Sequence, residues 1–193
     1  MIDLGTQHFK EGDNGSRKLY LGFETCHIKH VFKEENGEEP FMLQKEFAWF
    51  MTSAKKEKTK LRQFIVQWFG KDFPDETAAQ AFDFSKLLGQ LAVLTVAHKP
   101  KNDGNMKNDI ADIYLPTPEQ RASSGTGYNK RICYEISMGQ NEVFKELPEF
   151  LQKKIMESDE MRGIGRATAP PAPSPAPVQP PAAVSAPEEE LAF

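Results

Sequence analysis

Alternating apolar and polar positions predict several strands in the first half of the chain. Residues 17–26 alternate in the manner of a half-buried strand, and a weaker strand is predicted over 27–33. An acidic turn centred on Asn36-Gly37 follows, which is a typical hairpin signal. Residues 41–51 then form the returning strand, rich in the aromatic residues that strands favour. Its residues of one parity are Phe41, Leu43, Lys45, Phe47, Trp49 and Met51.

Helical spacing follows directly after this strand. Leu61, Phe64, Ile65 and Trp68 recur at i, i+3, i+4 and i+7, which predicts a helix over about 57–69 that Gly70 ends. The first sixteen residues show little periodicity and are predicted to be an irregular arm. The rest of the chain predicts, in order, short helical pieces over 72–88, strands over 91–98 and 106–115, a loop over 119–130, an alternating segment over 131–137 and a helix over 148–158.

Three strands, a helix and two more strands is the element order of a five-stranded OB barrel. We therefore expect a mainly β protein with helices (α+β): an OB-like barrel with a helix between strands 3 and 4, and a C-terminal helix. A small α+β sandwich would give a similar pattern. The expected OB-like domain spans 1–160, and 161–193 is an expected disordered tail, since eight of the fourteen prolines lie from Ala167 onward.

Net charge does not by itself indicate a partner. The chain carries −4, but three glutamates and no basic residue lie in 167–193, so the rest holds 24 basic and 28 − 3 = 25 acidic groups, a net of −1. A case for nucleic acid must therefore rest on local clustering. Two cysteines, Cys26 and Cys133, favour free buried thiols over one disulfide. Since no N-terminal signal segment and no run of 18 apolar residues occurs, we expect a soluble protein of the cytoplasm, without membrane contact.

A basic cluster and an aromatic strand lie next to each other in the sequence. Residues 55–62 hold five positive charges, suited to phosphates or to a solvated face. The rings of the 41–51 strand suit either base stacking or the core, and Trp68 suits the core. Lysines also flank the turn between the last two predicted strands. The candidate DNA-binding residues are Tyr20, Lys45, Phe47, Trp49, Lys55, Lys56, Lys58, Lys60, Arg62, Lys99, Lys101 and Lys107.

Metal and catalytic motifs are weak. Cys26-His27-x-x-His30 could begin a zinc site, but it has no convincing second pair of ligands. Asp103, Asp109 and Asp112 could suggest a two-metal nuclease, yet none is embedded in an apolar run, where the pKa of a carboxyl is tuned. Gly125-Thr126-Gly127 lacks the lysine and helix of a phosphate loop. We expect no metal, no cofactor and no enzymatic activity.

A series of short segments extends over most of the body, up to about Glu160. They are Leu4-Gly5-Thr6, 18–24 (KLYLGFE), Pro40, Lys45-Glu46-Phe47, Lys60-Leu61-Arg62, 68–73 (WFGKDF), Phe82-Asp83-Phe84, Leu87-Leu88-Gly89, Val96-Ala97-His98, 147–150 (LPEF), Ile155 and Ser158. In this order and spacing they resemble a family of phage-encoded OB-fold single-stranded-DNA-binding proteins of replication and recombination modules, which implies that 1–160 is a single-strand-binding domain. The aromatic residues Trp49 and Phe50 depart from the family pattern, which has smaller or polar residues there.

The end of the chain resembles the acidic tip of bacterial single-strand-binding proteins, which docks on repair and replication enzymes. Ala192 stands where that tip usually has proline. The expected partner-binding residues are Glu188, Glu189, Glu190, Leu191 and Phe193.

The resemblance implies sequence-independent binding of single-stranded DNA in phage DNA replication and recombination, in the cytoplasm of a bacterial host. The tip would recruit replication and recombination proteins, and the protein could form a homo-oligomer. The alternative is a phage protein-interaction adaptor, or an inhibitor of a host replication or defence enzyme, that uses the OB-like body as a scaffold. A subunit of a recombination enzyme is a third interpretation.

Overall fold

The computed structural model describes residues 1–52, 57–100, 104–125 and 127–163. Its strands are β1 (Ile2–Gln7), β2 (Ser16–His30), β3 (Glu39–Ala48), β4 (Val93–Pro100) and β5 (Met106–Tyr114). Its α-helices are α1 (Lys60–Phe69), α2 (Glu76–Gln80), α3 (Pro118–Ser123), α4 (Glu142–Lys145), α5 (Glu149–Met156) and α6 (Asp159–Arg162), and its 3-10 turns are η1 (Glu34–Asn36), η2 (Phe84–Leu87) and η3 (Ile136–Met138).

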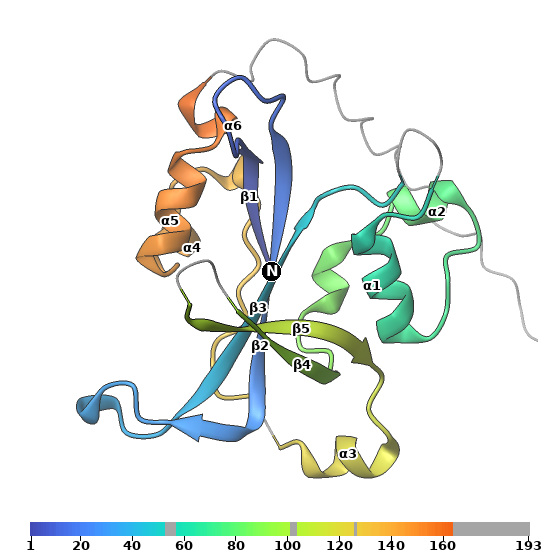
Figure 1. The fold of residues 1–193 in the computed structure, drawn as a ribbon, viewed down its shortest axis with the longest axis vertical. Helices are drawn as coiled ribbons and strands as arrows, with labels where there is room; N and C mark the ends of the chain where they lie inside the picture. The colour runs from blue at the N-terminus through green and yellow to red at the C-terminus, as the bar shows by residue number, and fades with distance from the viewer. Residues whose placement is uncertain (53–56, 101–103, 126, 164–193) are drawn as a thin grey trace, which may run out of the picture.

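The strands form two antiparallel sheets. One has the order β1-β2-β3, with the long strand β2 in the centre, and the other is the β4–β5 hairpin. Figure 1 shows this hairpin crossing the middle of β2 and β3, with α1 to one side of the crossing. Helices α5 and α6 pack against β1, on the other side of the strands from α1 in Figure 1.

Strand β2 has a core on each of its faces. Leu19 and Leu21 point into the larger core, which α1, β3 and β5 also build. Tyr20 points the other way, into a second core with Tyr134 and residues of α5. The predicted alternation of direction is confirmed, but the prediction of a half-buried strand is wrong in this region: both faces are covered, because α5 adds an apolar layer over Tyr20.

The prediction of a five-stranded barrel is wrong. Within the described residues no backbone ladder joins the two sheets, so the strands do not close. Strand β5 does contact β3 and α1, but a side chain occupies the gap: the Lys45 ammonium donates a hydrogen bond to the backbone carbonyl of Ile110. A lysine that reaches into a backbone gap satisfies one carbonyl and leaves the gap open at the surface.

Four element predictions also need correction. The expected irregular arm over 1–16 contains β1, and the two strands predicted over 17–33 form one long strand, β2. Helix α3 begins at Pro118 and occupies the first part of the predicted 119–130 loop; a capping box of Thr117 and Gln120 starts it. Segment 131–137 forms no strand: it makes a single parallel bridge, between Ile2 and Tyr134, and then enters η3.

A buried carboxylate explains why the pattern of apolar residues missed β1. The Asp3 side chain is completely buried, and it accepts hydrogen bonds from the Arg17 guanidinium at 2.5 and 3.2 Å. It also accepts from the backbone N–H groups of Gly5 and Ile136. A fully partnered acid can occupy a core position, where a sequence pattern counts it as a surface residue.

Helix α1 agrees with its prediction. The Thr59 hydroxyl caps the N-terminus by accepting from the Arg62 N–H, and Gly70 ends the helix in the left-handed region at φ 66°. The predicted apolar stripe is buried, and the indole N–H of Trp68 donates to the Leu91 carbonyl at 3.0 Å. The helix therefore presents one face to the core and leaves the other face to the surface.

Candidate functional site

An open groove of about 950 Å³ lies where the two sheets fail to close. Strand β3 forms its floor, α1 forms one wall, and the β4–β5 hairpin forms the other. Phe47 and Phe64 underlie it as part of the core. The lining residues are Phe41, Met42, Leu43, Gln44, Lys45, Glu46, Phe47, Lys60, Gln63, Phe64, Gln67, Lys99, Lys107, Asn108, Asp109 and Ala111.

The groove brings together lysines that are far apart in the sequence. Lys45, Lys60, Lys99 and Lys107 come from four different elements, and the acidic residues of the lining are Glu46 and Asp109. Four positive and two negative side chains leave a formal excess of two positive charges on the lining. A concave surface with this excess concentrates anionic ligands, although the chain as a whole is acidic.

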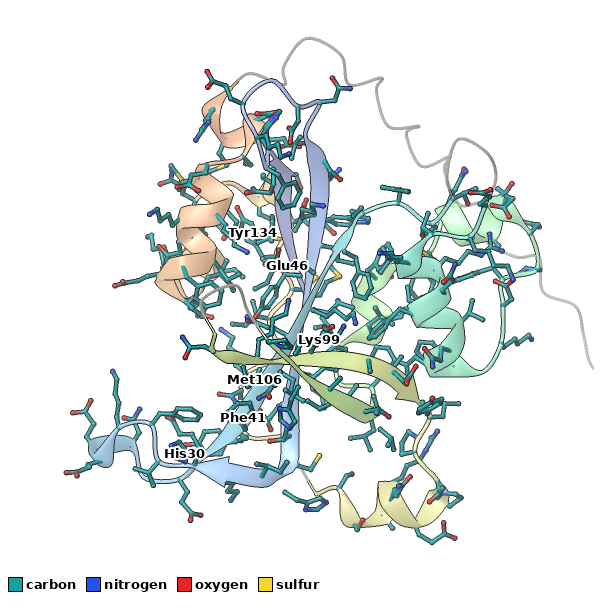
Figure 2. The ribbon with its side chains drawn as sticks, viewed as in Figure 1. His30, Phe41, Glu46, Lys99, Met106 and Tyr134 are labelled. Carbon is teal, nitrogen blue, oxygen red and sulfur yellow. The ribbon has the colours of Figure 1, made fainter. Side chains whose placement is uncertain are left out.

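Ion pairs compensate both acids of the groove. Asp109 pairs with Lys99, and its carboxylate lies 3.6 Å from the Lys45 ammonium. The hydrogen bond from Lys99 lowers the pKa of Asp109, and the nearby ammonium groups of Lys45 and Lys107 lower it further, so this carboxylate stays ionised at neutral pH. Glu46 pairs with Lys154 of α5 (Figure 2 labels Glu46 and Lys99).

Two lysines of the groove are left for a ligand. Lys60 and Lys107 are both exposed and make no ion pair with any other residue in the described part of the chain. An incoming anion could therefore pair with these two ammonium groups without breaking an existing ion pair. We regard them as the strongest anion contacts that this surface offers.

Helix α1 contributes a polar stripe to the wall. Lys60, Gln63 and Gln67 lie at i, i+3 and i+7, and the Gln67 amide donates to Asp112 at 3.0 Å. The two glutamines are groove residues that the sequence analysis missed. Their helical spacing opposite the apolar stripe was the signal that could have found them.

The aromatic candidates lie elsewhere than expected. Phe47 is buried, at 6% exposure, with its ring 4.8 Å from that of Phe64, so the core interpretation holds and no base can stack on it. Tyr20 is buried in the second core, where its hydroxyl donates to Gln44 at 2.7 Å. Trp49 is half-buried, edge-on to Phe84, and the Arg17 guanidinium lies 4.5 Å from its ring. Tyr20 and Trp49 do not line the groove, and Phe47 lies beneath its floor.

The described residues of the basic cluster over 55–62 do not share one environment. Arg62 is 3% exposed and pairs with Asp72 at 3.1 Å and Glu76 at 2.6 Å, so it holds α1 against the segment that follows and is not free to contact phosphate. Lys58 pairs with Asp72 at 2.6 Å. These contacts, that of Lys58 first, lower the pKa of Asp72 to about 2. Of the described members of the cluster, Lys60 is the one that reaches the groove.

Several predicted residues lie outside the described residues. These are Lys55, Lys56, Lys101, Asp103, Thr126 and the whole tip with Glu188, Glu189, Glu190, Leu191 and Phe193. From residue 164 onward, the predicted disordered tail lies outside them as well.

The described residues contain no group of three or more histidine, cysteine or acidic side chains placed to hold a metal ion. Cys26 and Cys133 are not bonded to each other; Cys26 is exposed, against the expectation of a buried thiol. Among the helices of the described segments, none combines the length and apolar character needed to cross a membrane.

Comparison with known proteins adds no relative: no protein-family model, curated protein or solved structure matches this chain. The groove and the chemistry of the sequence are therefore what indicates a function for this chain.

Proposed function

We propose that this protein binds single-stranded DNA, without sequence preference, in the groove between β3, α1 and the β4–β5 hairpin. The observation that carries the proposal is the gathering of Lys45, Lys60, Lys99 and Lys107 around one open groove on an otherwise acidic chain. Non-specific single-strand binding combines a positively charged groove that follows the backbone with rings that stack on bases. Lysine contacts to phosphate are not sequence-specific, which fits the expected role in replication and recombination.

The groove also offers polar groups besides its charges. Gln63, Gln67 and Asn108 carry amides that can bond to phosphate, sugar or base edges. Their side chains line the walls beside the lysines, so a strand in the groove would meet both kinds of contact. The proposal needs no catalytic group, no metal and no cofactor.

The acidic-aromatic tip supplies the second half of the proposed function. Glu188 to Glu190 and Phe193 would bind a basic, apolar pocket on a replication or recombination protein. The body would hold the DNA while the tip brings the partner to it. This part of the proposal comes from the sequence, because the tip lies outside the described residues.

A salt titration tests the groove. Binding of a fluorescent oligo(dT) is measured by anisotropy from low to physiological salt, for the native protein and for the double variant Lys60→Ala/Lys107→Ala. A lysine that neutralises one phosphate of a single strand contributes about 0.7 to the slope of log K against log salt, so the double variant should lower that slope by about 1.4. Both side chains are exposed, so the variant should fold normally.

A matched control removes the same charge elsewhere. Lys10 and Lys153 are exposed lysines of the β1–β2 turn and of α5, and neither lines the groove. Lys10→Ala/Lys153→Ala should keep the native slope. An equal decrease of the slope in the two double variants would show that net charge, and not the groove, controls binding. Failure of the native protein to bind oligo(dT) at low salt would reject the proposal in favour of the adaptor or inhibitor.

A further inference from the structure

The far half of the β2–β3 hairpin carries exposed apolar side chains. Residues 27–40, which we name the hairpin arm, extend away from the body of the molecule (Figure 1). A register shift between Glu24 and Lys29 marks the beginning of this arm. On it Ile28 is 63% exposed, Val31 45% and Phe32 52%. Side chains of this kind on a protruding arm indicate a binding surface.

Three rings on and beside the arm contact one another. The rings of Phe32 and Phe41 have centroids 6.0 Å apart and are inclined by 33°, and His30 meets Phe32 edge-on at 5.0 Å. Phe41 also packs against the larger core. Phe41 is therefore anchored, and it supports Phe32, whose ring remains half exposed. A ring held in place before binding loses little entropy when a ligand stacks on it.

The aromatic cluster continues the groove. Phe41 and Met42 line one end of the groove, and Phe41 belongs to the cluster as well. In Figure 2 the labelled residues Lys99, Phe41 and His30 follow one another from the β4–β5 hairpin down to the arm. A strand leaving the groove at this end therefore meets an aromatic surface directly.

The charges of the arm do not attract phosphate. Its two lysines, Lys29 and Lys33, are outnumbered by four glutamates, Glu34, Glu35, Glu38 and Glu39. Glu34 and Glu35 lie in η1 at the turn, and Glu39 pairs with His30 in the β2–β3 register. A nucleotide on the arm would therefore be held by contact of its base with the rings, and its phosphates would stay at the lysine groove.

We propose that Phe32 and Phe41 form a base-stacking platform for unpaired nucleotides that leave the lysine groove; this inference rests on the proposed function. It replaces the platform of Phe47 and Trp49 that the sequence suggested. Stacking on an aromatic side chain is tolerant of base identity because every base has a π face. The platform would thus add affinity without adding sequence preference.

The test compares Phe32→Ala with the native protein on two probes. One is oligo(dT), and the other is an abasic oligonucleotide of the same length, which keeps the sugar–phosphate chain and lacks bases. Loss of one stacked base should weaken oligo(dT) binding by about 5- to 150-fold and leave the salt slope unchanged. Binding of the abasic chain should not change. Phe32→Trp should keep native affinity, and its added indole fluorescence should be quenched by oligo(dT).

Phe9 provides the matched control. Among the described residues it is the most exposed large hydrophobic one, at 74%, and it lies in the turn between β1 and β2, outside the groove. Phe9→Ala should bind both probes as the native protein does. An equal loss in Phe9→Ala and Phe32→Ala would overturn the platform.

Two other results would also overturn it. If Phe32→Ala binds oligo(dT) normally while Lys60→Ala/Lys107→Ala is weakened, the groove stands and the platform does not. If Phe32→Ala instead dissociates a DNA-free oligomer in sedimentation velocity without affecting oligo(dT) binding, the arm is an interface between two copies of this chain. Failure of the native protein to bind either probe would reject the proposed function itself, which is a distinguishable outcome.

Discussion

At the scale of single residues, the environment decides what an amino acid does. Arg62 belongs to a run of basic residues that the sequence alone would place on one surface, yet it is buried and pairs with Asp72 and Glu76. Lys60, two positions earlier, is exposed in the groove. The helix turns by about 100° per residue, so neighbours in a charge run face different directions. A cluster in the sequence is therefore not a cluster in space.

The ion pairs of Asp72 predict a dependence of stability on pH. Its pKa is about 2 in the folded protein, against an ordinary value of 3.8, because Lys58 and Arg62 stabilise the carboxylate. Between these values the unfolded chain binds the proton and the folded chain does not. The stabilisation is complete above about pH 4 and is lost as the pH falls towards 2.

Urea unfolding between pH 7 and pH 2 measures this effect. The free energy of unfolding of the native protein should decrease as the pH falls through the acid range. In Asp72→Asn it should decrease less steeply with pH. Asp13, whose pKa is also about 2 through the backbone N–H groups of Phe9 and Gly15, contributes a separate share that remains in the variant. Identical slopes for Asp72→Asn and the native protein would contradict the assignment.

At the scale of elements, local signals set the helices more reliably than the strands. The stripe of α1, its Thr59 cap and its terminal Gly70 are all present in the sequence within a dozen positions. Strand β1, by contrast, depends on the pairing of Asp3 with Arg17 and on the bridge to Tyr134, which are contacts between distant parts of the chain. Local periodicity cannot report such contacts.

Gly70 offers a clean test of the helix end. It adopts φ 66°, and a Cβ added there would meet no atom within 4 Å, so a substitution would act through the backbone alone. Gly70→Ala should lower the free energy of unfolding by about 1 kcal/mol. Gly70→Asn should lower it by less, because asparagine tolerates the left-handed region. Equal stability of Gly70→Ala and the native protein in chemical denaturation would contradict this prediction.

At the scale of the whole molecule, the failure of the barrel to close is what produces the groove. The Lys45 side chain bonds to the Ile110 carbonyl where no backbone ladder joins β3 to β5, and α1 forms a wall of the groove. Phe41 lines this groove and contacts Phe32 of the hairpin arm. Phosphate contacts and stacking would then be arranged along one path.

The charge of the tip predicts that it regulates DNA binding along this path. Glu188, Glu189 and Glu190 oppose the charge of the lysine groove. The composition of residues 164–193 predicts a coil, and a coil of this length would place the tip roughly 30 Å from residue 163. The tip would then compete with DNA for the same lysines, most strongly at low salt.

Deletion of 186–193 should therefore tighten oligo(dT) binding at low salt, with the difference vanishing as salt screens both interactions. A triple variant that changes Glu188, Glu189 and Glu190 to glutamine keeps the length of the chain and should reproduce most of the gain. Anisotropy titrations across a salt series measure both. Unchanged affinity throughout the series would reject competition by the tip.

Much of the element order was predictable from the sequence, and the arrangement of those elements was not. The periodicity of residues 17–26, 41–51 and 61–68 predicted two strands and a helix, because side-chain spacing along one segment is a local property. The lysines at 45, 60, 99 and 107 were all candidates, but so were Tyr20, Phe47 and Arg62, which the structure buries.

Local periodicity was sufficient to predict the strongly periodic strands and helices, and charge identified the candidate lysines. The tertiary structure was needed to show which face of β3 is covered and that the two sheets do not join. It was also needed to show that the ring of Phe47 packs on Phe64 under the groove, while Phe41 connects the groove to Phe32. These outcomes depend on packing between segments that are far apart in the chain. No alternation within a strand can specify what will lie against it.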